Sequence, residues 1–139
     1  MDARLQQSGK QFVKFAVVGG TGTVVNLVVL KVTLFVWGRL VGDPTLPAEV
    51  FASALAFAVA VVNNYLLNRW WTFRSKGSMR SEFVKFLIVS LAGLGLNELA
   101  FLAFRGGLGI DVLLSQLLAI ACVLPFNFVV NKLWSFRGA

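Results

Sequence analysis

Four long apolar runs constrain the fold of this chain more than any other feature. They cover about residues 15–37, 48–67, 83–104 and 112–130. A helix needs about 20 predominantly apolar residues to cross the hydrocarbon core of a bilayer, and each run supplies about that length. Apolar residues make up 58% of the chain and charged residues 14%, too few to cover a small water-soluble domain. We therefore expect an all-α, polytopic membrane protein with four transmembrane helices in a single domain, residues 1–139.

The basic residues predict how these helices are oriented. With four spans, the N-terminus, the central connection and the C-terminus lie on the same side of the membrane. Those three segments carry ten of the thirteen Lys and Arg residues, whereas the opposite side carries Arg39 and Arg105. Because cytoplasmic segments are enriched in Lys and Arg, we expect both termini in the cytoplasm, in a multi-pass protein of the cytoplasmic (inner) membrane. The basic end then faces anionic lipid, and a nucleic-acid partner is not expected.

Two segments of the sequence, about 12–74 and 83–137, resemble each other. Seven of the fifteen positions from Phe12 to Asn26 are identical in the second segment, 71 residues later. The two segments also end on similar patterns. Since each segment contains two spans, both hairpins start on the same side, which predicts a parallel repeat about an axis along the membrane normal. Transporters use such repeats, but duplication of a stable hairpin explains the pattern equally well.

The motifs at the ends of the spans are similar to those of a known family. Phe15, Gly19 and Gly20 lie in the first span, and the second span closes on Asn-x-x-x-Asn-Arg-x-Trp-Thr-Phe, beginning at Asn64. A related pattern begins at Asn127. In these residues the chain resembles the GtrA-like family of small four-span membrane proteins. The resemblance implies flipping of a polyprenyl-phosphate-linked sugar for cell-surface polysaccharide or glycolipid synthesis. The alternative that it implies is a non-catalytic membrane adaptor or anchor for a glycosyltransferase partner.

A headgroup site is expected where the second and fourth spans end. The i, i+4 spacing places each pair of Asn residues on one helix face, and amides match sugar hydroxyls as donors and acceptors. Neighbouring cations suit a phosphate, and Trp rings suit the apolar face of a sugar. The candidate substrate-binding residues are Asn64, Asn68, Arg69, Trp71, Asn127, Asn131, Lys132, Trp134, Lys14 and Lys85. The structural alternative is that Asn joins helices, Trp lies at the interface, and Lys and Arg anchor the cytoplasmic ends.

Two charged residues, Lys31 and Glu98, lie deepest in the predicted spans. A charge at the centre of a span costs about 2.5–3.5 kcal/mol on insertion scales, so each side chain needs a partner, a function or a route to water. Three interpretations stay open. The two residues form an ion pair, Glu98 is a proton-coupling or substrate-sensing carboxylate, or Lys31 extends outwards to the interface.

The sequence carries no pattern typical of an enzyme. It has no phosphate-binding loop of the Walker type and no nucleophile beside a base. With no His and a single Cys, we expect neither a metal site nor a cofactor. Four spans make a thin wall around a polar path, so we expect a parallel homo-oligomer. A small multidrug-exporter-like transporter is a weaker alternative, because those proteins carry their carboxylate in the first span.

Overall fold

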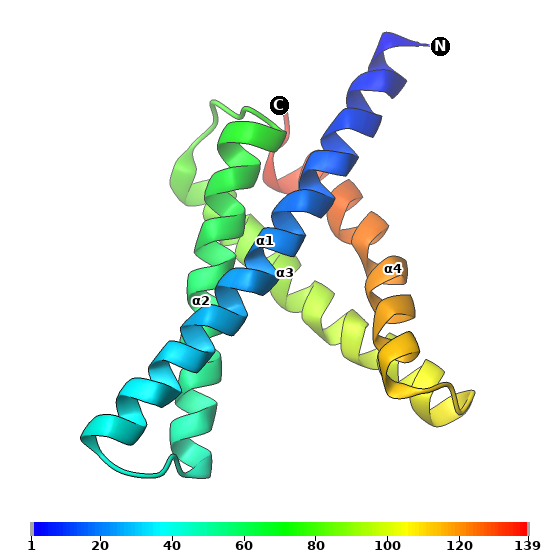
Figure 1. Ribbon diagram of the computed structural model, residues 1–139. Coiled ribbons are helices and arrows are strands. Elements are labelled where there is room, and N and C mark those ends of the chain that lie inside the picture. Colours follow the sequence, from blue (N-terminus) through cyan, green and yellow to red (C-terminus); the bar gives the residue numbers. More distant parts are fainter. Residues whose placement is uncertain (1, 139) are drawn as a thin grey trace.

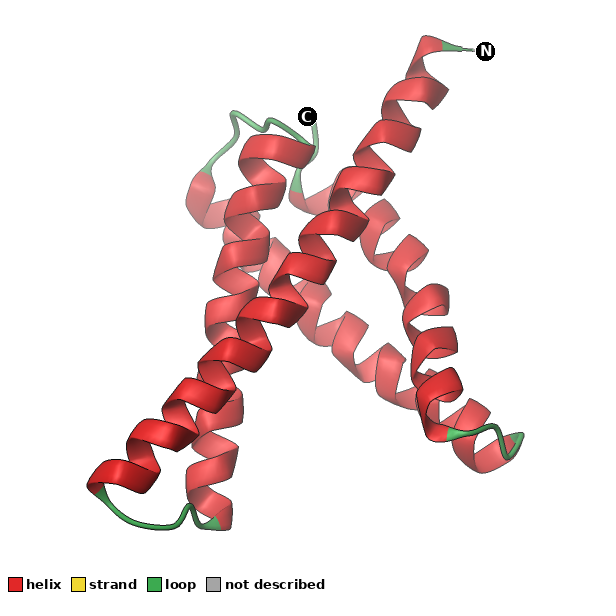
Figure 2. Ribbon diagram, in the orientation of Figure 1, coloured by secondary structure: helices red, strands yellow, loops and turns green. Residues whose placement is uncertain are grey.

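The computed structural model describes residues 2–138 and contains no strand among them. Four long helices, α1 (Ala3–Leu40), α2 (Leu46–Leu67), α3 (Met79–Leu102) and α4 (Val112–Val130), are joined by short loops (Figure 2). Each helix is long and apolar enough to cross a membrane. The prediction of an all-α, four-span membrane protein is therefore confirmed. The inner membrane and the cytoplasmic position of the termini stay predictions.

The helices form two hairpins, α1 with α2 and α3 with α4. Both termini and the connection between α2 and α3 lie at one end of the molecule, which we call the terminal end (Figure 1). From there the hairpins diverge towards the two loops that join α1 to α2 and α3 to α4, which we call the outer connections. The connection between α2 and α3 thus joins the two arms at the terminal end.

Capping residues fix where the helices begin. The Asp111 carboxylate accepts the backbone N–H of Leu114 at 3.1 Å, as an N-cap of α4 should. Ser78 caps α3 in the same way through Ser81. Pro47 lies in the first turn of α2, where its missing N–H costs no hydrogen bond. These starts were predicted from the sequence to within a few residues.

Helix α1 begins at Ala3, well before the expected start near residue 15. Its 38 residues correspond to about 57 Å at 1.5 Å per residue, far more than the roughly 30 Å of a hydrocarbon core. Asp2 caps it, and no Pro interrupts the polar residues that follow. The apolar run therefore predicted the membrane-crossing part of α1 but not its polar extension, which projects beyond the bundle (Figure 1).

Three of the helices end in a wide π-helical turn: η1 (Asn68–Thr72) after α2, η2 (Ala103–Gly107) after α3, and η3 (Asn131–Ser135) after α4. In η1 the N–H of Phe73 donates to the carbonyl of Asn68, and in η3 that of Phe136 donates to Asn131, both at 2.8 Å. Such turns are rare and occur frequently at functional sites. Here η1 and η3 contain the second Asn of each pair and the Trp that follows it, whereas η2 carries neither.

An aromatic cluster joins the hairpins near the terminal end. Its buried members are Phe15, Val61, Tyr65, Phe73, Phe86, Phe128 and Phe136. Phe73 and Phe136 stack at 4.9 Å between ring centroids. All four helices contribute a side chain to this cluster, whereas many large apolar side chains elsewhere are exposed, as lipid-facing residues are. The cluster is thus the main packed contact between the two arms.

Candidate functional site

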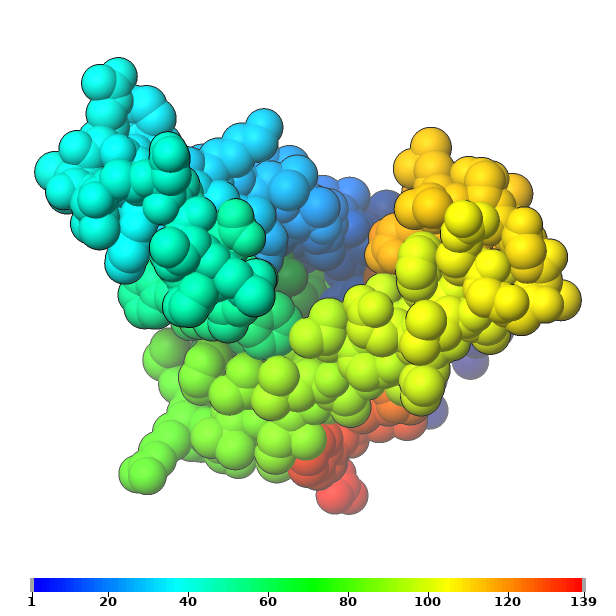
Figure 3. Space-filling model, turned by 90° about the horizontal axis from the view of Figure 1, so that it is seen from below, coloured from blue at the N-terminus to red at the C-terminus, as the bar shows by residue number. Residues whose placement is uncertain are grey.

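A cavity of about 510 Å³ lies between the two hairpins. Seen from the side of the outer connections, the space-filling view shows it as a hollow between the arms (Figure 3). All four helices line it with apolar residues and with uncharged polar side chains. The polar lining residues are Thr23, Asn26, Asn64, Asn68, Ser90, Asn97, Gln116, Asn127 and Asn131. No Lys, Arg, Asp or Glu from the described residues lines the cavity.

The four Asn residues singled out in the sequence meet in this cavity. Asn68 is 2% exposed, yet its Oδ1 has no hydrogen-bond partner, and neither has the buried Oδ1 of Asn127. By contrast, Asn131 donates to the carbonyl of Asn127 at 2.9 Å and accepts the hydroxyl of Ser135 at 2.8 Å. Buried polar atoms in proteins are almost always hydrogen-bonded. The two unpartnered oxygens are therefore free to accept hydrogen bonds from a hydroxyl-bearing ligand or from water.

The polar groups extend along the helices rather than forming one ring. On α4 and η3 they reach from Gln116 to Asn131, a separation of about 22 Å along a helix. On α1 and α3, Asn26 and Asn97 each lie four residues, about one helical turn, beyond a lining glycine, Gly22 or Gly93. The polar groups thus spread over a length comparable with much of the roughly 30 Å hydrocarbon thickness, with apolar residues between them.

Two glycines make room for two of these amides. A Cβ atom on Gly22 would overlap the side-chain amide of Asn64, and one on Gly93 would overlap that of Asn127. Gly20 and Gly95, in contrast, face open space. Gly22 and Gly93 occupy matching positions in the two sequence segments, so each hairpin contains the same glycine–asparagine contact.

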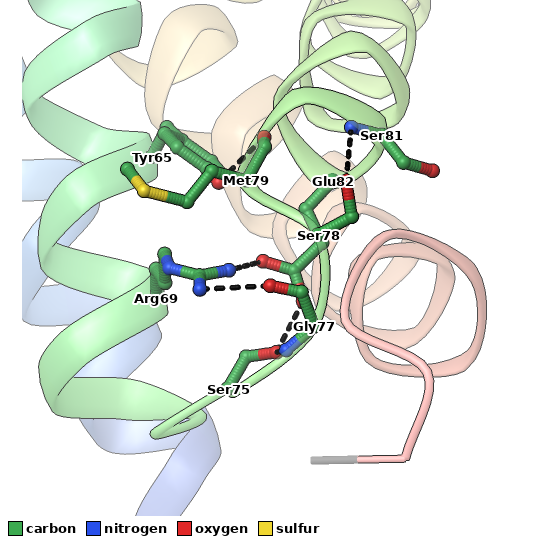
Figure 4. Close-up of polar contacts among 8 residues, drawn as sticks. All are labelled: Tyr65, Arg69, Ser75, Gly77, Ser78, Met79, Ser81 and Glu82. Atoms are coloured by element: carbon green, nitrogen blue, oxygen red, sulfur yellow. Dashed lines mark hydrogen bonds and ion pairs between the residues drawn. The ribbon is translucent and has the colours of Figure 1, made fainter.

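Arg69 lies outside the cavity, in a buried polar cluster at the start of α3 (Figure 4). Its guanidinium forms an ion pair with Glu82 and donates to the carbonyl of Gly77 at 2.8 Å. Glu82 also accepts the hydroxyl of Ser75, and the Tyr65 hydroxyl donates to the carbonyl of Met79 at 2.9 Å. These contacts neutralise Arg69 and fix the connection between α2 and α3.

The other cationic and aromatic candidates pair with each other outside the cavity. The Lys14 ammonium lies 5.2 Å from the Trp71 ring centroid and donates to its carbonyl at 3.4 Å. Lys85 lies 6.0 Å from the ring centroid of Trp134, so each hairpin has one such Lys–Trp pair. Lys132 donates to the Ser8 hydroxyl at 2.6 Å. All of these residues lie towards the terminal end.

Lys31 and Glu98 are both exposed and do not form an ion pair. Within residues 2–138 the one salt bridge joins Arg69 to Glu82. Helix α1 packs against α2, η1 and α4, and not against α3, which carries Glu98. Lys31 and Glu98 thus lie on two helices, α1 and α3, that do not contact each other. The other two interpretations of these residues stay predictions.

The family model named "GtrA/DPMS, transmembrane domain" matches residues 14–136. The chain belongs to this family. The resemblance noted in the sequence is therefore confirmed over nearly the whole described length, including both sets of Asn and Trp motifs.

The chain is also similar in sequence to two individual proteins. The chain is 33% identical over 92 residues to the uncharacterized membrane protein YngA of Bacillus subtilis, covering 66% of this chain and 59% of YngA. It is 32% identical over 126 residues to the dolichol-phosphate mannosyltransferase of Pyrococcus furiosus, covering 88% of this chain and 32% of the enzyme. The chain thus spans less than two thirds of the length of either relative.

Several polar residues of the site were missed by the sequence analysis. Asn26 and Asn97 are identical at matching positions of the two segments, and that identity was the signal for including them. Ser90, Gln116 and Glu82 gave no such signal. Their importance follows from contacts between helices, which a single sequence does not reveal.

Proposed function

We propose that this GtrA/DPMS-family protein moves the headgroup of a polyprenyl-phosphate-linked sugar across the cytoplasmic membrane, for cell-surface polysaccharide or glycolipid synthesis. The observation that carries the proposal is the uncharged, amide-lined cavity between the hairpins. A sugar hydroxyl that leaves water without a new hydrogen bond costs several kcal/mol, roughly 4–8 in a fully apolar medium. Asn and Gln side chains both donate and accept, so they replace water for a hydroxyl of either orientation.

The distribution of charge supports a division of the ligand into three parts. The cavity suits the neutral sugar, because no charged side chain of the described residues lines it. The Lys14, Lys85 and Lys132 ammonium groups lie towards the terminal end and suit the phosphate. The polyprenyl chain stays in lipid along the exposed apolar side chains of the helices. No covalent step is needed, so we propose a protein without enzymatic activity.

The name of the archaeal relative supports the substrate class. It is a dolichol-phosphate mannosyltransferase, and dolichol is a polyprenol, so that protein handles a sugar and a polyprenyl phosphate. The shared region is about a third of that enzyme. The proposal transfers the lipid-linked sugar, and not the transferase reaction, to this chain.

The direct test measures headgroup crossing in proteoliposomes. A fluorescent, short-chain polyprenyl-phosphate sugar is placed in both leaflets, and an impermeant quencher reports how fast inner-leaflet molecules appear outside. We expect the protein to accelerate crossing. We expect Asn68→Leu with Asn127→Leu to slow it about tenfold or more, since one lost hydrogen bond to a buried group costs about 1–3 kcal/mol. Unaccelerated crossing by the correctly folded protein would contradict translocation.

The matched control is Asn63→Leu. Asn63 lies on the same helix as Asn64, is half-buried, and does not line the cavity. Its amide donates to the Asn64 Oδ1 at 3.5 Å, and Asn64 is unchanged in the cavity variant. The proposal expects this variant to keep the wild-type rate. Equal slowing by Asn63→Leu and by the cavity variants would contradict a specific role for the cavity amides.

A second candidate is a membrane adaptor for a glycosyltransferase. The observation that favours it is that the matching region forms only 32% of the archaeal enzyme, so a domain of this kind exists within a longer transferase. Here the basic terminal end would hold the enzyme. Co-purification with a glycosyltransferase, together with no acceleration of headgroup crossing, would support the adaptor.

We also propose a parallel homo-oligomer. The cavity opens between the arms, and a second copy would complete its wall. Because the ten basic residues at one end favour a single orientation, the copies would lie parallel in the membrane. Mass measurement of the protein extracted with its native lipid would give the number of copies.

A further inference from the structure

A second, smaller cavity of about 320 Å³ lies where α1 meets η1, towards the terminal end. Its lining residues are Gln7, Lys10, Gln11, Lys14, Thr72, Phe73 and Arg74. Three cations and no carboxylate line it. The residues differ from those of the central cavity, and Phe15 and Phe73 of the aromatic cluster lie between the two.

Two polar atoms in this smaller cavity have no partner. Gln11 is 6% exposed and Thr72 is 4% exposed, yet the Oε1 of Gln11 and the Oγ1 of Thr72 make no hydrogen bond. A buried hydroxyl without a partner normally costs free energy, so its retention calls for an explanation. Beside three cations, a hydroxyl donor and an amide complete the set of groups that bind a phosphate oxygen.

The cations around this cavity are not neutralised by acidic side chains. The one salt bridge within residues 2–138 involves Arg69, so Lys10, Lys14 and Arg74 have none. The Lys14 ammonium donates to the Trp71 carbonyl and lies over the Trp71 ring, both uncharged. Arg74 has a φ of 50°, a left-handed conformation that is uncommon for a residue other than glycine.

The matching positions of the second hairpin show that this arrangement is particular to the first. Seventy-one residues after Gln11 stands Glu82, which pairs with Arg69. The residue that matches Thr72 is Ser135, whose hydroxyl donates to Asn131 at 2.8 Å. The carboxylate and the hydroxyl of the second segment are therefore bonded to other side chains of the protein, whereas the equivalent Gln11 oxygen and Thr72 hydroxyl of the first segment have no partner.

We infer that Lys10, Gln11, Lys14, Thr72 and Arg74 form a phosphate-binding site separate from the central cavity. The site shares Lys14 with the lysines proposed for the substrate phosphate, but it is argued from the smaller cavity and not from headgroup transport. The exposed Trp71 and Trp134 side chains lie near this end, and Trp marks the depth of lipid headgroups. The phosphate of an anionic lipid is thus the ligand that the site meets in a membrane, and a soluble phosphate ion shares its chemistry.

Binding is measured on the full-length protein in detergent. Native mass spectrometry counts bound dioleoyl phosphatidic acid, and separate arms use phosphatidylcholine and inorganic phosphate. We expect one tightly bound phosphatidic acid, and Lys10→Ala with Arg74→Ala to weaken it at least about tenfold, the effect of about 1.4 kcal/mol. Phosphatidylcholine should not compete. Binding of inorganic phosphate with equal affinity would keep the site but assign it to a soluble ligand.

The control removes the same amount of charge from the same region. Lys76→Ala with Arg80→Ala changes two exposed basic residues that do not line the cavity. We expect this variant to bind like the wild type. If both double variants lose binding equally, the attraction is a diffuse surface effect and the site does not exist.

A second variant separates binding from folding. Thr72→Val keeps the shape of the side chain and removes the unpartnered hydroxyl. If the hydroxyl serves a ligand, the variant binds phosphatidic acid more weakly while its melting temperature without ligand stays the same or rises. A lower melting temperature with unchanged binding would overturn the assignment of Thr72 to the site.

Discussion

Arg69 shows how one residue can satisfy a motif for a structural reason. Its position after the Asn pair suggested a phosphate ligand, but its guanidinium is buried against Glu82. Removing one partner of a buried pair leaves an uncompensated charge, which costs about 3–5 kcal/mol. We therefore propose that Arg69 holds the connection between α2 and α3, and that the lysines bind the phosphate of the lipid-linked sugar.

The first prediction follows from that pair. Arg69→Ala should lower the stability of the folded protein by about 3–5 kcal/mol, because Glu82 then stays buried and charged. Arg69→Met combined with Glu82→Gln should recover most of the loss, since neither side chain is charged. Thermal unfolding in detergent measures both. Arg80 is an exposed basic residue of the same region, so Arg80→Ala should change the stability little. A loss of stability in Arg80→Ala as large as in Arg69→Ala would contradict the explanation.

The second prediction concerns the glycines that face the amides. Gly22→Ala and Gly93→Ala should each displace an Asn side chain, because the added Cβ overlaps the amide of Asn64 or Asn127. The amide can move, so we expect a folded protein with slower headgroup crossing. Gly20→Ala and Gly95→Ala add the same atom to open space and should cross at the wild-type rate. If all four variants keep the wild-type crossing rate, the positions of the Asn64 and Asn127 amides do not determine the rate of headgroup crossing, and the prediction is wrong.

For individual residues, the sequence indicated which side chains line the cavity better than it indicated which side chains contact each other. The Asn pairs were expected on one helix face, and they do line the cavity. Glu82 and Gln116 were not expected, because their roles depend on which faces of different helices meet. The periodicity of one helix contains no information about the neighbour that it packs against.

At the scale of elements, the π-helical turns place the aromatic residues that join the hairpins. Phe73 follows η1 and Phe136 follows η3, and the wide turns bring these rings to a 4.9 Å stack. Both residues are almost wholly buried, with Phe136 at 0% exposure. The two motif-bearing turns therefore have a packing role as well as carrying Trp71 and Trp134.

The third prediction tests that role. Phe136→Ala should destabilise the protein by about 3–5 kcal/mol, the usual cost of deleting a buried aromatic side chain. Phe126→Ala changes a Phe of α4 that is 42% exposed and should cost about 0.5 kcal/mol or less. Melting temperatures in the same detergent compare the two. Equal losses would show that the cluster around Phe136 does not hold the hairpins together.

Helix positions were largely predictable, and their polar ends were not. Apolar runs and capping residues such as Asp111 located the membrane-crossing parts and the start of α4. The extension of α1 to Ala3 was missed, because hydropathy marks what lipid covers and not how far a helix continues into water. The π-helical turns also leave no mark in a hydropathy pattern.

For the whole molecule, the unequal distribution of charge makes the fourth prediction. In a Cys122→Ala background, an impermeant maleimide should label Asp43→Cys in intact cells and Lys76→Cys only after the membrane is opened. The reason is that the excess of Lys and Arg predicts a cytoplasmic position for the terminal end. Labelling of both positions in intact cells would show mixed orientation and would reopen the small multidrug-exporter interpretation.

Aromatic packing joins the two arms near the terminal end, and Figure 1 shows them farthest apart at the outer connections. The aromatic cluster therefore restrains the arms least at the outer connections. We expect the distance between the two outer connections to depend on the acyl-chain composition of the leaflet around them, so that the lipid sets how wide the cavity opens.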